Sequence, residues 1–229
     1  MISQQPAFQI RLISGMEKCF IILTLLLSLM IESSEMKCNE PTSSDIEGPF
    51  YYPNPPHQRL FCRYKKQNAP LYVFGVVFAQ DCKTPLQGVK VEMWQADHDG
   101  EYRNETKCRG YVTTNKNGIY KLKTIYPGKY TMSEFESDFR PAHLHFKING
   151  KKGHKTLITQ MYFAGDKHLG QNDACDGCSS DRKELIVKPK RVCTRKTKCV
   201  DIAEFNITLS KGTGVHVSEA ITEKDKLLC

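Results

Sequence analysis

The stretch Leu71-Tyr72-Val73-Phe74-Gly75-Val76-Val77-Phe78-Ala79 is built almost entirely from β-branched and aromatic residues, which favour strands. A polar turn follows it, and residues 88–94 then alternate between apolar and polar side chains, as a half-buried strand does. Asn117-Gly118 is a strong turn dipeptide, and it opens a second alternating segment, Ile119 to Thr124. This succession of short strands and turns predicts an all-β fold, either a sandwich or a barrel.

The rest of the chain continues this pattern. After residue 34, no window of ten or more residues shows a convincing apolar period of 3.6 residues, so no long helix is expected. Further strands are predicted over residues 129–135, 142–148, 156–163, 184–187 and 202–209.

The beginning of the chain has the features of a secretory leader. The segment from Cys19 to Ile31 carries no charge and follows Lys18. It is shorter than the roughly 20 residues that span a bilayer, and it has the length of a signal-peptide core. We therefore predict a signal peptide over residues 1–34, with Met16 as an alternative start, and a single domain over residues 35–229. An uncleaved N-terminal anchor is the alternative.

Composition places the chain among globular proteins. Of its 229 residues, 40% are hydrophobic and 25% are charged, which excludes a largely disordered chain. The net charge of +8 does not by itself select a partner. Of the 10 cysteines, all but Cys19 follow the predicted leader, and most should be bridged in an oxidising compartment. Because nine cysteines is an odd number, one should remain without a disulfide partner, and Cys229 is a candidate. We expect the protein to be secreted.

Residues 166–198 are polar, irregular and rich in cysteine. Cys175 and Cys178 have the spacing of half a zinc site, but the spacing of Cys193 and Cys199 is longer. Disulfides are therefore favoured over zinc. The basic run from Lys188 through Lys198 has no interleaved aromatic residues, so we interpret it as a solvated loop and expect no nucleic-acid partner.

The stretch Arg140-Pro141-Ala142-His143-Leu144-His145-Phe146 carries the most chemical information. Residues i and i+2 of a strand point to the same face, so His143 and His145 can converge on one metal ion. Pro141 suits the start of a strand, and Arg140 can direct its charge at the same pocket. Two ordinary strand histidines are the alternative, and composition does not say which tyrosines, if any, bind a metal.

Five segments, taken in their order and spacing, resemble the intradiol ring-cleavage dioxygenases, and the likeness spans about residues 45–187. The segments are 47–51, 91–102, 124–130, 140–145 and 159–163. The resemblance implies an antiparallel β-sandwich with irregular cysteine-rich loops. It also implies a non-haem ferric ion, Fe(III), whose ligands would be Tyr102, Tyr130, His143 and His145.

By the same resemblance, the protein would cleave catechols with O2 between the two hydroxyl-bearing carbons, giving cis,cis-muconate-type diacids. Tyr130 would leave the metal and take a proton, Arg140 would stabilise charge developing on the ring, and Gln160 would help to position the ring. Two phenolate ligands favour Fe(III) over Fe(II), unlike the carboxylate-containing ligand set of ferrous oxygenases.

The predicted leader and the cysteines resemble those of the secreted branch of the family, which is seen in fungi and plant-feeding arthropods. Plant-derived or dietary phenolics are therefore the expected substrates. The short segment before Glu47 leaves no room for a long N-terminal dimerisation helix, and we expect a monomer or weak oligomer without membrane association after leader removal. Two alternatives are a metal-free, transthyretin-like binding module and an inactive relative that only binds catechols.

Overall fold

The computed structural model describes residues 40–62, 70–102, 106–131, 139–151, 153–193 and 199–218. The predicted leader, Cys38 and Cys229 lie outside these ranges. Asn39–Cys229 forms a compact unit of its own, and the fold described is that of this unit. None of the helices in the described ranges is long and apolar enough to cross a membrane.

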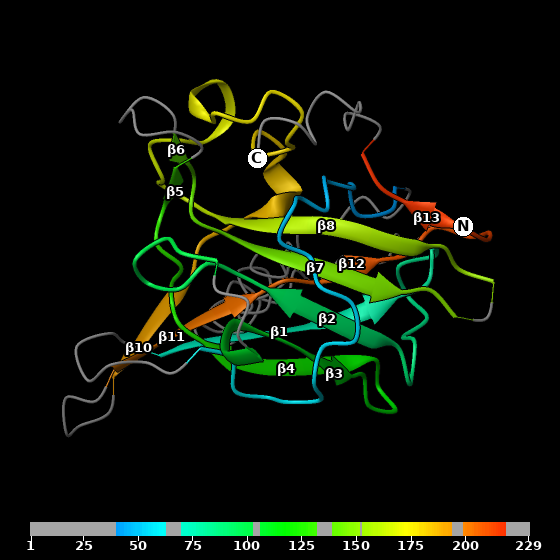
Figure 1. Cartoon of the computed structure of the whole chain (residues 1–229). Coiled ribbons are helices and arrows are strands. Elements are labelled where there is room, and N and C mark those ends of the chain that lie inside the picture. The colour runs from blue at the N-terminus through cyan, green and yellow to red at the C-terminus, as the bar shows by residue number, and fades with distance from the viewer. Residues whose placement is uncertain are drawn as a thin grey trace, which may run out of the picture. The chain divides into compact units, whose positions relative to one another are not determined.

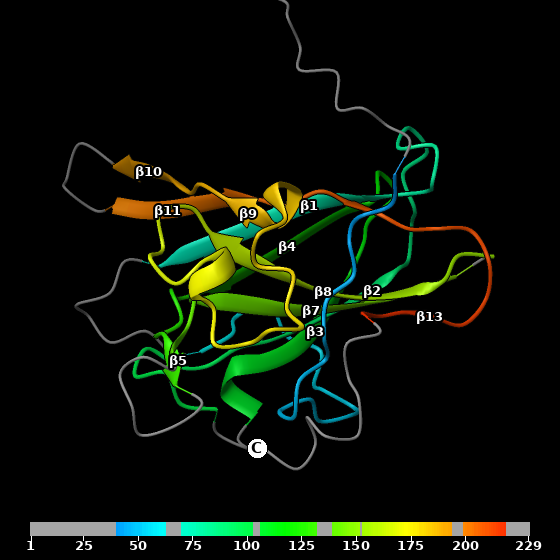
Figure 2. The ribbon, with the colours of Figure 1, turned by 90° about the horizontal axis from the view of Figure 1, so that it is seen from above.

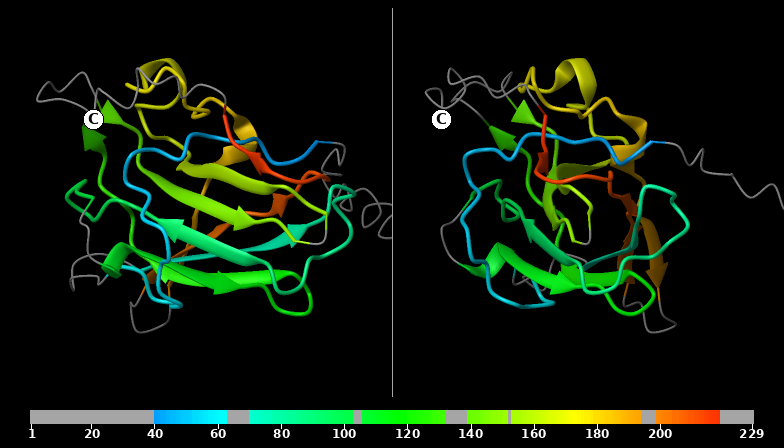
Figure 3. Two further views of the ribbon diagram at one scale, coloured as in Figure 1. Left: turned by 45° about the vertical axis from the view of Figure 1, so that its right-hand side comes forward. Right: turned by 90° about the vertical axis from the view of Figure 1, so that its right-hand side faces the viewer.

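The described residues form two large sheets, which Figures 1 and 3 show as layers. In the first sheet, β1 lies between β4 on one side and β11 and β12 on the other, and β10 pairs with β11. The second sheet has the order β13-β8-β7-β2-β3, with β9 also beside β8. A small ribbon pairs β5 with β6. The strands are β1 (Leu71–Phe78), β2 (Lys90–Trp94), β3 (Arg109–Thr113), β4 (Ile119–Thr124), β5 (Tyr130–Thr131), β6 (Phe139–Arg140), β7 (His143–Asn149), β8 (Thr156–Phe163), β9 (Ile186–Val187), β10 (Lys190–Cys193), β11 (Cys199–Glu204), β12 (Ile207–Thr208) and β13 (Val215–His216). Short 3-10 turns lie at η1 (Thr106–Cys108), η2 (Gly170–Asn172) and η3 (Lys183–Leu185).

The core lies between the two sheets because their strands alternate. On β1, Val73 and Val77 are fully buried, whereas Tyr72 is 39% exposed. From β7, the ring of Phe146 meets the rings of Tyr120 and Phe205. Burying an apolar side chain of this size stabilises the fold by about 1.5–3 kcal/mol. The predicted all-β sandwich is confirmed.

The sheets are mixed rather than purely antiparallel. Around β1 and β8, the pairs β1–β4 and β7–β8 are antiparallel, but β11 and β12 run parallel to β1, and β9 and β13 run parallel to β8. The parallel partners all come from the last part of the chain: β9 lies within the cysteine-rich stretch 166–198, and β11, β12 and β13 follow it. A long connection can return to the starting end of a strand, which a tight hairpin cannot do.

Several strand bounds agree closely with the sequence expectations, and others do not. β4 and β8 have the predicted bounds, but residues 202–209 are divided between β11 and β12, and residues 184–187 are partly the turn η3. The interpretation of residues 188–198 as a loop is wrong for β10, which pairs with β11 in a hairpin (Figure 2). All the residues of β10 are exposed, so the hydrophobic pattern could not reveal it.

The expected disulfides are confirmed, and no zinc is needed to explain these cysteines. The bridged pairs are Cys62–Cys108, Cys175–Cys178 and Cys193–Cys199, and Cys82 is also disulfide-bonded. The assignment of Cys229 as the unpaired residue lies outside the described residues.

One extended segment, residues 40–62, crosses the outer face of the second sheet from β8 to β3 (Figures 1 and 2). The amide of Asp45 donates to the carbonyl of Ile158 on β8. Further along, Glu47 pairs with Lys147 of β7, and the hydroxyl of Tyr51 donates to Glu92 of β2. Side chains that point outward from the middle of this sheet are therefore covered rather than solvated.

Candidate active site

The predicted histidine pair lies on the covered outer face of the second sheet. Along β7, Leu144, Phe146 and Ile148 point into the core, so His143 and His145 point the other way. The register places Gln160 of β8 and Trp94 of β2 on either side of His145. The indole of Trp94 stacks on the imidazole of His145, with ring centroids 4.8 Å apart and the planes 7° from parallel.

Three polar atoms converge at this face. The hydroxyl of Tyr102 lies 3.0 Å from Nε2 of His143 and 3.1 Å from Nε2 of His145. The two Nε2 atoms are themselves 3.1 Å apart. A nearly equilateral triangle of one phenol oxygen and two imidazole nitrogens therefore forms from residues that lie 41 and 43 positions apart in the sequence.

The tautomer of His143 follows from its other nitrogen. Nδ1 lies 2.7 Å from the carbonyl oxygen of Pro141, which can only accept, so Nδ1 carries the hydrogen. Nε2 therefore presents a lone pair to the triangle, provided that the ring is neutral. Burial lowers the pKa of His143 well below 6.5, and the positive charge of Arg140 adds to this effect. Burial also lowers the pKa of His145, followed by the charges of His143 and Arg140.

The donor set fits a metal ion. Two neutral imidazoles and one phenol place more lone pairs than hydrogens at the triangle, and Nδ1 of His145 is buried without a hydrogen-bond partner. Metal–nitrogen bonds of about 2 Å let one ion reach three atoms at this spacing. Burial raises the pKa of Tyr102 far above its ordinary value, and the nearby Tyr130 adds to the rise. Without a cation the phenol therefore stays neutral; a bound ferric ion would favour the phenolate.

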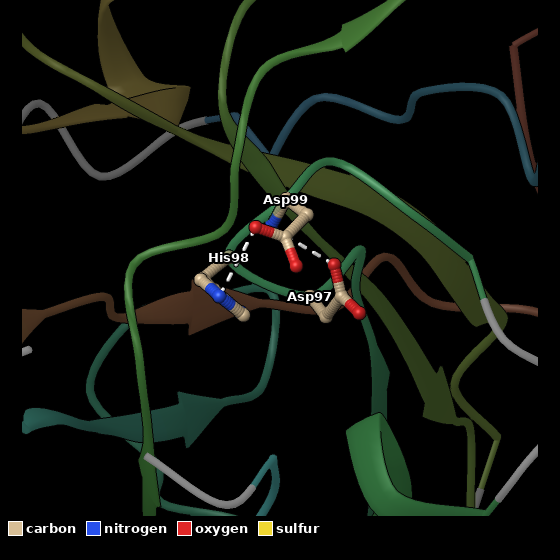
Figure 4. Close-up of side chains that lie close together, drawn as sticks. All are labelled: Asp97, His98 and Asp99. Atoms are coloured by element: carbon tan, nitrogen blue, oxygen red, sulfur yellow. Dashed lines mark hydrogen bonds and ion pairs between the residues drawn. The ribbon is translucent and has the colours of Figure 1, made fainter. Parts of the chain in front are cut away.

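A tight turn delivers Tyr102. The carboxylate of Asp97 accepts hydrogen bonds from the amides of Asp99 and Glu101, and Figure 4 shows Asp97, His98 and Asp99 together. Gly100 has φ of +87°, and a Cβ there would lie 2.3 Å from the carbonyl oxygen of Lys129. This close approach brings the turn against the segment that leads into Tyr130. The hydrogen bonds of this turn and the ion pair between His98 and Asp99 explain why the three side chains in Figure 4 lie close together.

Tyr130 begins β5, directly opposite Arg140 of β6. Its ring lies edge-on to that of Tyr102, with centroids 5.5 Å apart and an interplanar angle of 83°. Phe50, from the crossing segment, stacks flat on Tyr102 at 4.3 Å and meets the Tyr130 ring edge-on. The structure thus brings both predicted tyrosines to one aromatic cluster beside the histidines.

Arg140 and Gln160 form a buried polar network next to the triangle. The guanidinium places Nη1 3.5 Å from Nε2 of His143, and Nη2 donates to Oε1 of Gln160 at 3.2 Å. Nε and Nη2 also donate to the carboxylate of Asp173, at 3.1 and 3.3 Å. Burial would lower the pKa of Arg140, but Tyr162, Asp173 and Asp45 outweigh it and raise that pKa. The guanidinium is therefore a fixed positive charge.

Four residues of this site were not anticipated from the sequence. Tyr162 donates to Asp45 at 2.8 Å, and Asp173 holds Arg140. Trp94 stacks on His145. Trp94 and Tyr162 had a signal, since each lies in a predicted strand and in a segment that carries the family resemblance. The two aspartates come from irregular segments, so their partners follow from the tertiary fold alone.

The depressed histidine pKa values predict that the metal-free protein loses stability in acid. In the unfolded chain these histidines take up protons near pH 6.5, whereas the folded state keeps them neutral. The stabilisation is therefore present above pH 6.5 and is lost as the pH falls below it, by up to about 1.4 kcal/mol per histidine and pH unit.

Denaturant unfolding of the metal-free protein between pH 7.5 and 5 measures this dependence. The variant His143→Gln should flatten the slope. Equal slopes in native protein and His143→Gln would contradict the expectation.

Fold and side chains together define a β-sandwich protein with a buried tyrosine–histidine centre suited to a ferric ion. A family model described as a dioxygenase matches residues 46–211. The chain is 32% identical to the 6-chlorohydroxyquinol 1,2-dioxygenase of Cupriavidus pinatubonensis, over 68% of this chain and 61% of that protein. It is 28% identical to the intradiol ring-cleavage dioxygenase prcA of Aspergillus niger, over 74% of this chain and 59% of that one.

Solved structures agree with this assignment. The 3-chlorocatechol 1,2-dioxygenase of Rhodococcus opacus superimposes with a TM-score of 0.66 at 27% identity, covering 82% of this chain and 78% of that one. The catechol 1,2-dioxygenase of Pseudomonas arvilla gives a TM-score of 0.66 at 25% identity, covering 86% and 72%. The chain belongs to the intradiol ring-cleavage dioxygenase family. It spans about three fifths of the length of the first two curated relatives, 61% and 59%.

Proposed function

We propose that this protein is a secreted non-haem Fe(III) dioxygenase that cleaves catechols between their hydroxyl-bearing carbons to give cis,cis-muconate-type diacids. The observation that carries the proposal is the triangle formed by the Tyr102 hydroxyl and the Nε2 atoms of His143 and His145. Family membership supports it, because several relatives are by name 1,2-dioxygenases of catechol, chlorocatechol or 6-chlorohydroxyquinol.

Four side chains would hold the ion: Tyr102, Tyr130, His143 and His145. Bound there, a ferric ion supplies the Lewis acidity that deprotonates a chelating catechol and the redox activity that lets its ring react with O2. Neighbouring residues hold the proposed metal ligands in fixed orientations. Pro141 fixes the tautomer of His143, and Trp94 and Phe50 hold the planes of His145 and Tyr102 by stacking.

The other residues act on charge and protons. Arg140 is a buried cation at the edge of the triangle, so it stabilises negative charge on a deprotonated catechol and on the ring as it reacts. Gln160 contacts Arg140 through Oε1, while its Nε2 donates to the carbonyl of Ile46, so its amide is held in one orientation. The phenol oxygen of Tyr130 is the site that we assign to accept a substrate proton.

Oxygen consumption together with product analysis tests the reaction. Both atoms of O2 should enter the ring-opened diacid, so oxygen-18 gas should label the product twice, and one O2 should disappear per catechol. Hydroquinone, whose hydroxyls are not adjacent, is the control and should not be cleaved. Binding of catechol without oxygen uptake would make the protein an inactive catechol-binding relative, and a quinone product would make it an oxidase.

Tyr130→Phe is expected to lower kcat about 100-fold or more, because the variant loses the proton-accepting oxygen. Iron should stay bound, since Tyr102, His143 and His145 remain to hold it and the ring can keep its edge-on contacts with Phe50 and Tyr102. Iron content and kcat should be measured on the same preparation. Tyr126→Phe, in the same segment, is the matched control: its ring packs on Phe163 rather than on Tyr102. An unchanged kcat in Tyr130→Phe would remove this residue from the mechanism.

The proposed setting is extracellular, with plant-derived or dietary phenolics as substrates. The charge-free segment from Cys19 to Ile31 and the disulfides support secretion. Comparison of kcat/KM across catechol, caffeic acid, protocatechuic acid and chlorinated catechols tests the substrate class. N-terminal sequencing of protein recovered from the medium of a eukaryotic host tests the leader, and retention inside the cells would contradict it.

A further inference from the structure

The orientation of Arg140 is set from the side opposite to the histidines. The carboxylate of Asp173 receives Nε at 3.1 Å through Oδ1 and Nη2 at 3.3 Å through Oδ2. Both residues are buried. A two-point contact between a carboxylate and a guanidinium fixes the plane of the guanidinium as well as its distance. That plane decides where the remaining nitrogen, Nη1, points, which is toward Nε2 of His143 at 3.5 Å.

Asp173 is in turn held by the loop that follows it. The amide of Cys175 donates to Oδ1 of Asp173 at 3.1 Å, so that the carboxylate cannot rotate freely. The Cys175–Cys178 disulfide closes this loop over a sequence separation of 3. The amide of Cys178 also donates to the carbonyl of Cys175 at 3.2 Å. The disulfide thus restrains the residue whose amide fixes the Asp173 carboxylate.

The far end of the same loop reaches the other half of the network. The amide of Ser179 donates to Oδ2 of Asp45 at 3.1 Å, and its hydroxyl donates to the carbonyl of Ser44 at 3.1 Å. Asp45 accepts from Tyr162 at 2.8 Å, and the hydroxyl of Tyr162 lies 3.1 Å from Oε1 of Gln160. The Cys175–Cys178 disulfide therefore lies between two hydrogen-bonded contacts. One runs through Asp173 to Arg140, and the other runs through Asp45 and Tyr162 to Gln160.

We propose that Asp173 is a positioning residue that aims Arg140 at the tyrosine–histidine triangle, and that the Cys175–Cys178 disulfide keeps Asp173 in place. This inference rests on the proposed dioxygenase function. Asp173 acts through Arg140 and does not contact the tyrosine–histidine triangle in any of the contacts described. Its loss should therefore reduce the rate of the chemical step and leave iron binding intact.

Asp173→Asn tests the first half of the proposal. We expect kcat to fall about 10-fold to 100-fold, as small displacements of a catalytic group do, with the iron content and the visible band of the resting protein unchanged. In an Arg140→Lys background the same substitution should change kcat less than about twofold, because the two residues act as a unit. Asp176→Asn is the matched control, since Asp176 lies in the same loop and is exposed.

A purely structural salt bridge would give a different result. Asp173→Asn would then lower the melting temperature but leave kcat, measured well below melting, within about twofold of the native value. That outcome would overturn the proposal, as would an equal loss of kcat in the Arg140→Lys background. If the native protein itself cleaves no catechol, the proposed function fails, and this is seen before any variant is compared.

The double variant Cys175→Ser/Cys178→Ser tests the second half of the proposal, that the disulfide keeps Asp173 in place. It also tests the proposal if Asp173→Asn does not fold. Its kcat should fall with iron retained, in the same direction as for Asp173→Asn. The control is Cys193→Ser/Cys199→Ser, which removes the disulfide of the β10–β11 hairpin, away from this network. Equal activity of the two double variants would refute a role for the Cys175–Cys178 disulfide.

Discussion

His143→Ala is expected to abolish stoichiometric iron binding and, with it, ring cleavage. The variant removes one corner of the triangle and leaves the Tyr102 hydroxyl and Nε2 of His145 as the remaining pair. Changing only an outer hydrogen-bond partner of a metal ligand costs about 10-fold to 100-fold in affinity or activity, so removing a ligand should exceed 100-fold. Iron per chain and kcat are the quantities to measure.

His57→Ala is the matched control, because His57 is exposed on the crossing segment and its ring packs against Tyr111. It should bind iron and turn over catechol as the native protein does. Circular dichroism distinguishes loss of metal from loss of fold. Full iron occupancy in a folded His143→Ala protein would remove His143 from the ligand set.

Arg140→Leu should be among the most destabilising single substitutions at this site. The side chain of Arg140 is only 6% exposed, and that of its partner Asp173 is 1% exposed. Without the guanidinium, the Asp173 carboxylate remains buried with no positive charge beside it in the described network. Breaking a buried ion pair by removing one partner costs about 3–5 kcal/mol. Denaturant unfolding of the metal-free protein gives the free energy of unfolding directly, without the contribution of iron.

The chain supplies its own control for this effect, a pair in which only the arginine is exposed. Arg191 makes the same two-point contact with Asp201, with Nε and Nη2 both at 2.9 Å from carboxylate oxygens, but its side chain is 63% exposed. The side chain of Asp201 is itself only 5% exposed, but Arg191, which pairs with it, lies in water, so water can reach the carboxylate in Arg191→Leu and this variant should cost clearly less stability than Arg140→Leu. Adding Asp173→Asn to Arg140→Leu should restore part of the lost stability, because it removes the uncompensated charge. Similar costs for Arg140→Leu and Arg191→Leu would contradict this account of the network.

The strands whose bounds were predicted correctly are those in which the local sequence pattern agrees with which side chains are buried. β4 alternates and follows Asn117-Gly118, and β8 is rich in apolar and β-branched residues, so each has the bounds expected. β10 could not be found in this way, because pairing with β11 and the Cys193–Cys199 disulfide stabilise it, not burial. The parallel partners of β1 depend on how the chain returns after residue 193, which no local pattern encodes.

The residues of the site fall into the same two groups, those that a local sequence pattern places and those that only the tertiary fold brings together. The two-residue period of a strand is sufficient to place His143 and His145 on one face. The register that sets Trp94 against His145, and the turn that carries Tyr102 to both histidines, are tertiary facts. Tyr102, Tyr130 and Gln160 were predicted only through the family resemblance, whereas Arg140 was also expected from its position just before the histidine pair. The roles of all four residues stay predictions. Asp45 and Asp173 contact the network from segments more than a hundred residues apart, so no spacing rule reaches them.

The visible spectrum of the purified protein, reconstituted with iron and then mixed with catechol without oxygen, tests the central claim most directly. The proposed centre predicts stoichiometric iron, a tyrosinate-to-Fe(III) charge-transfer band, and a shift of that band when catechol displaces a ligand. Tyr102→Phe should weaken the band. A colourless protein that binds no iron under these conditions, or one whose spectrum does not respond to catechol, would contradict the account.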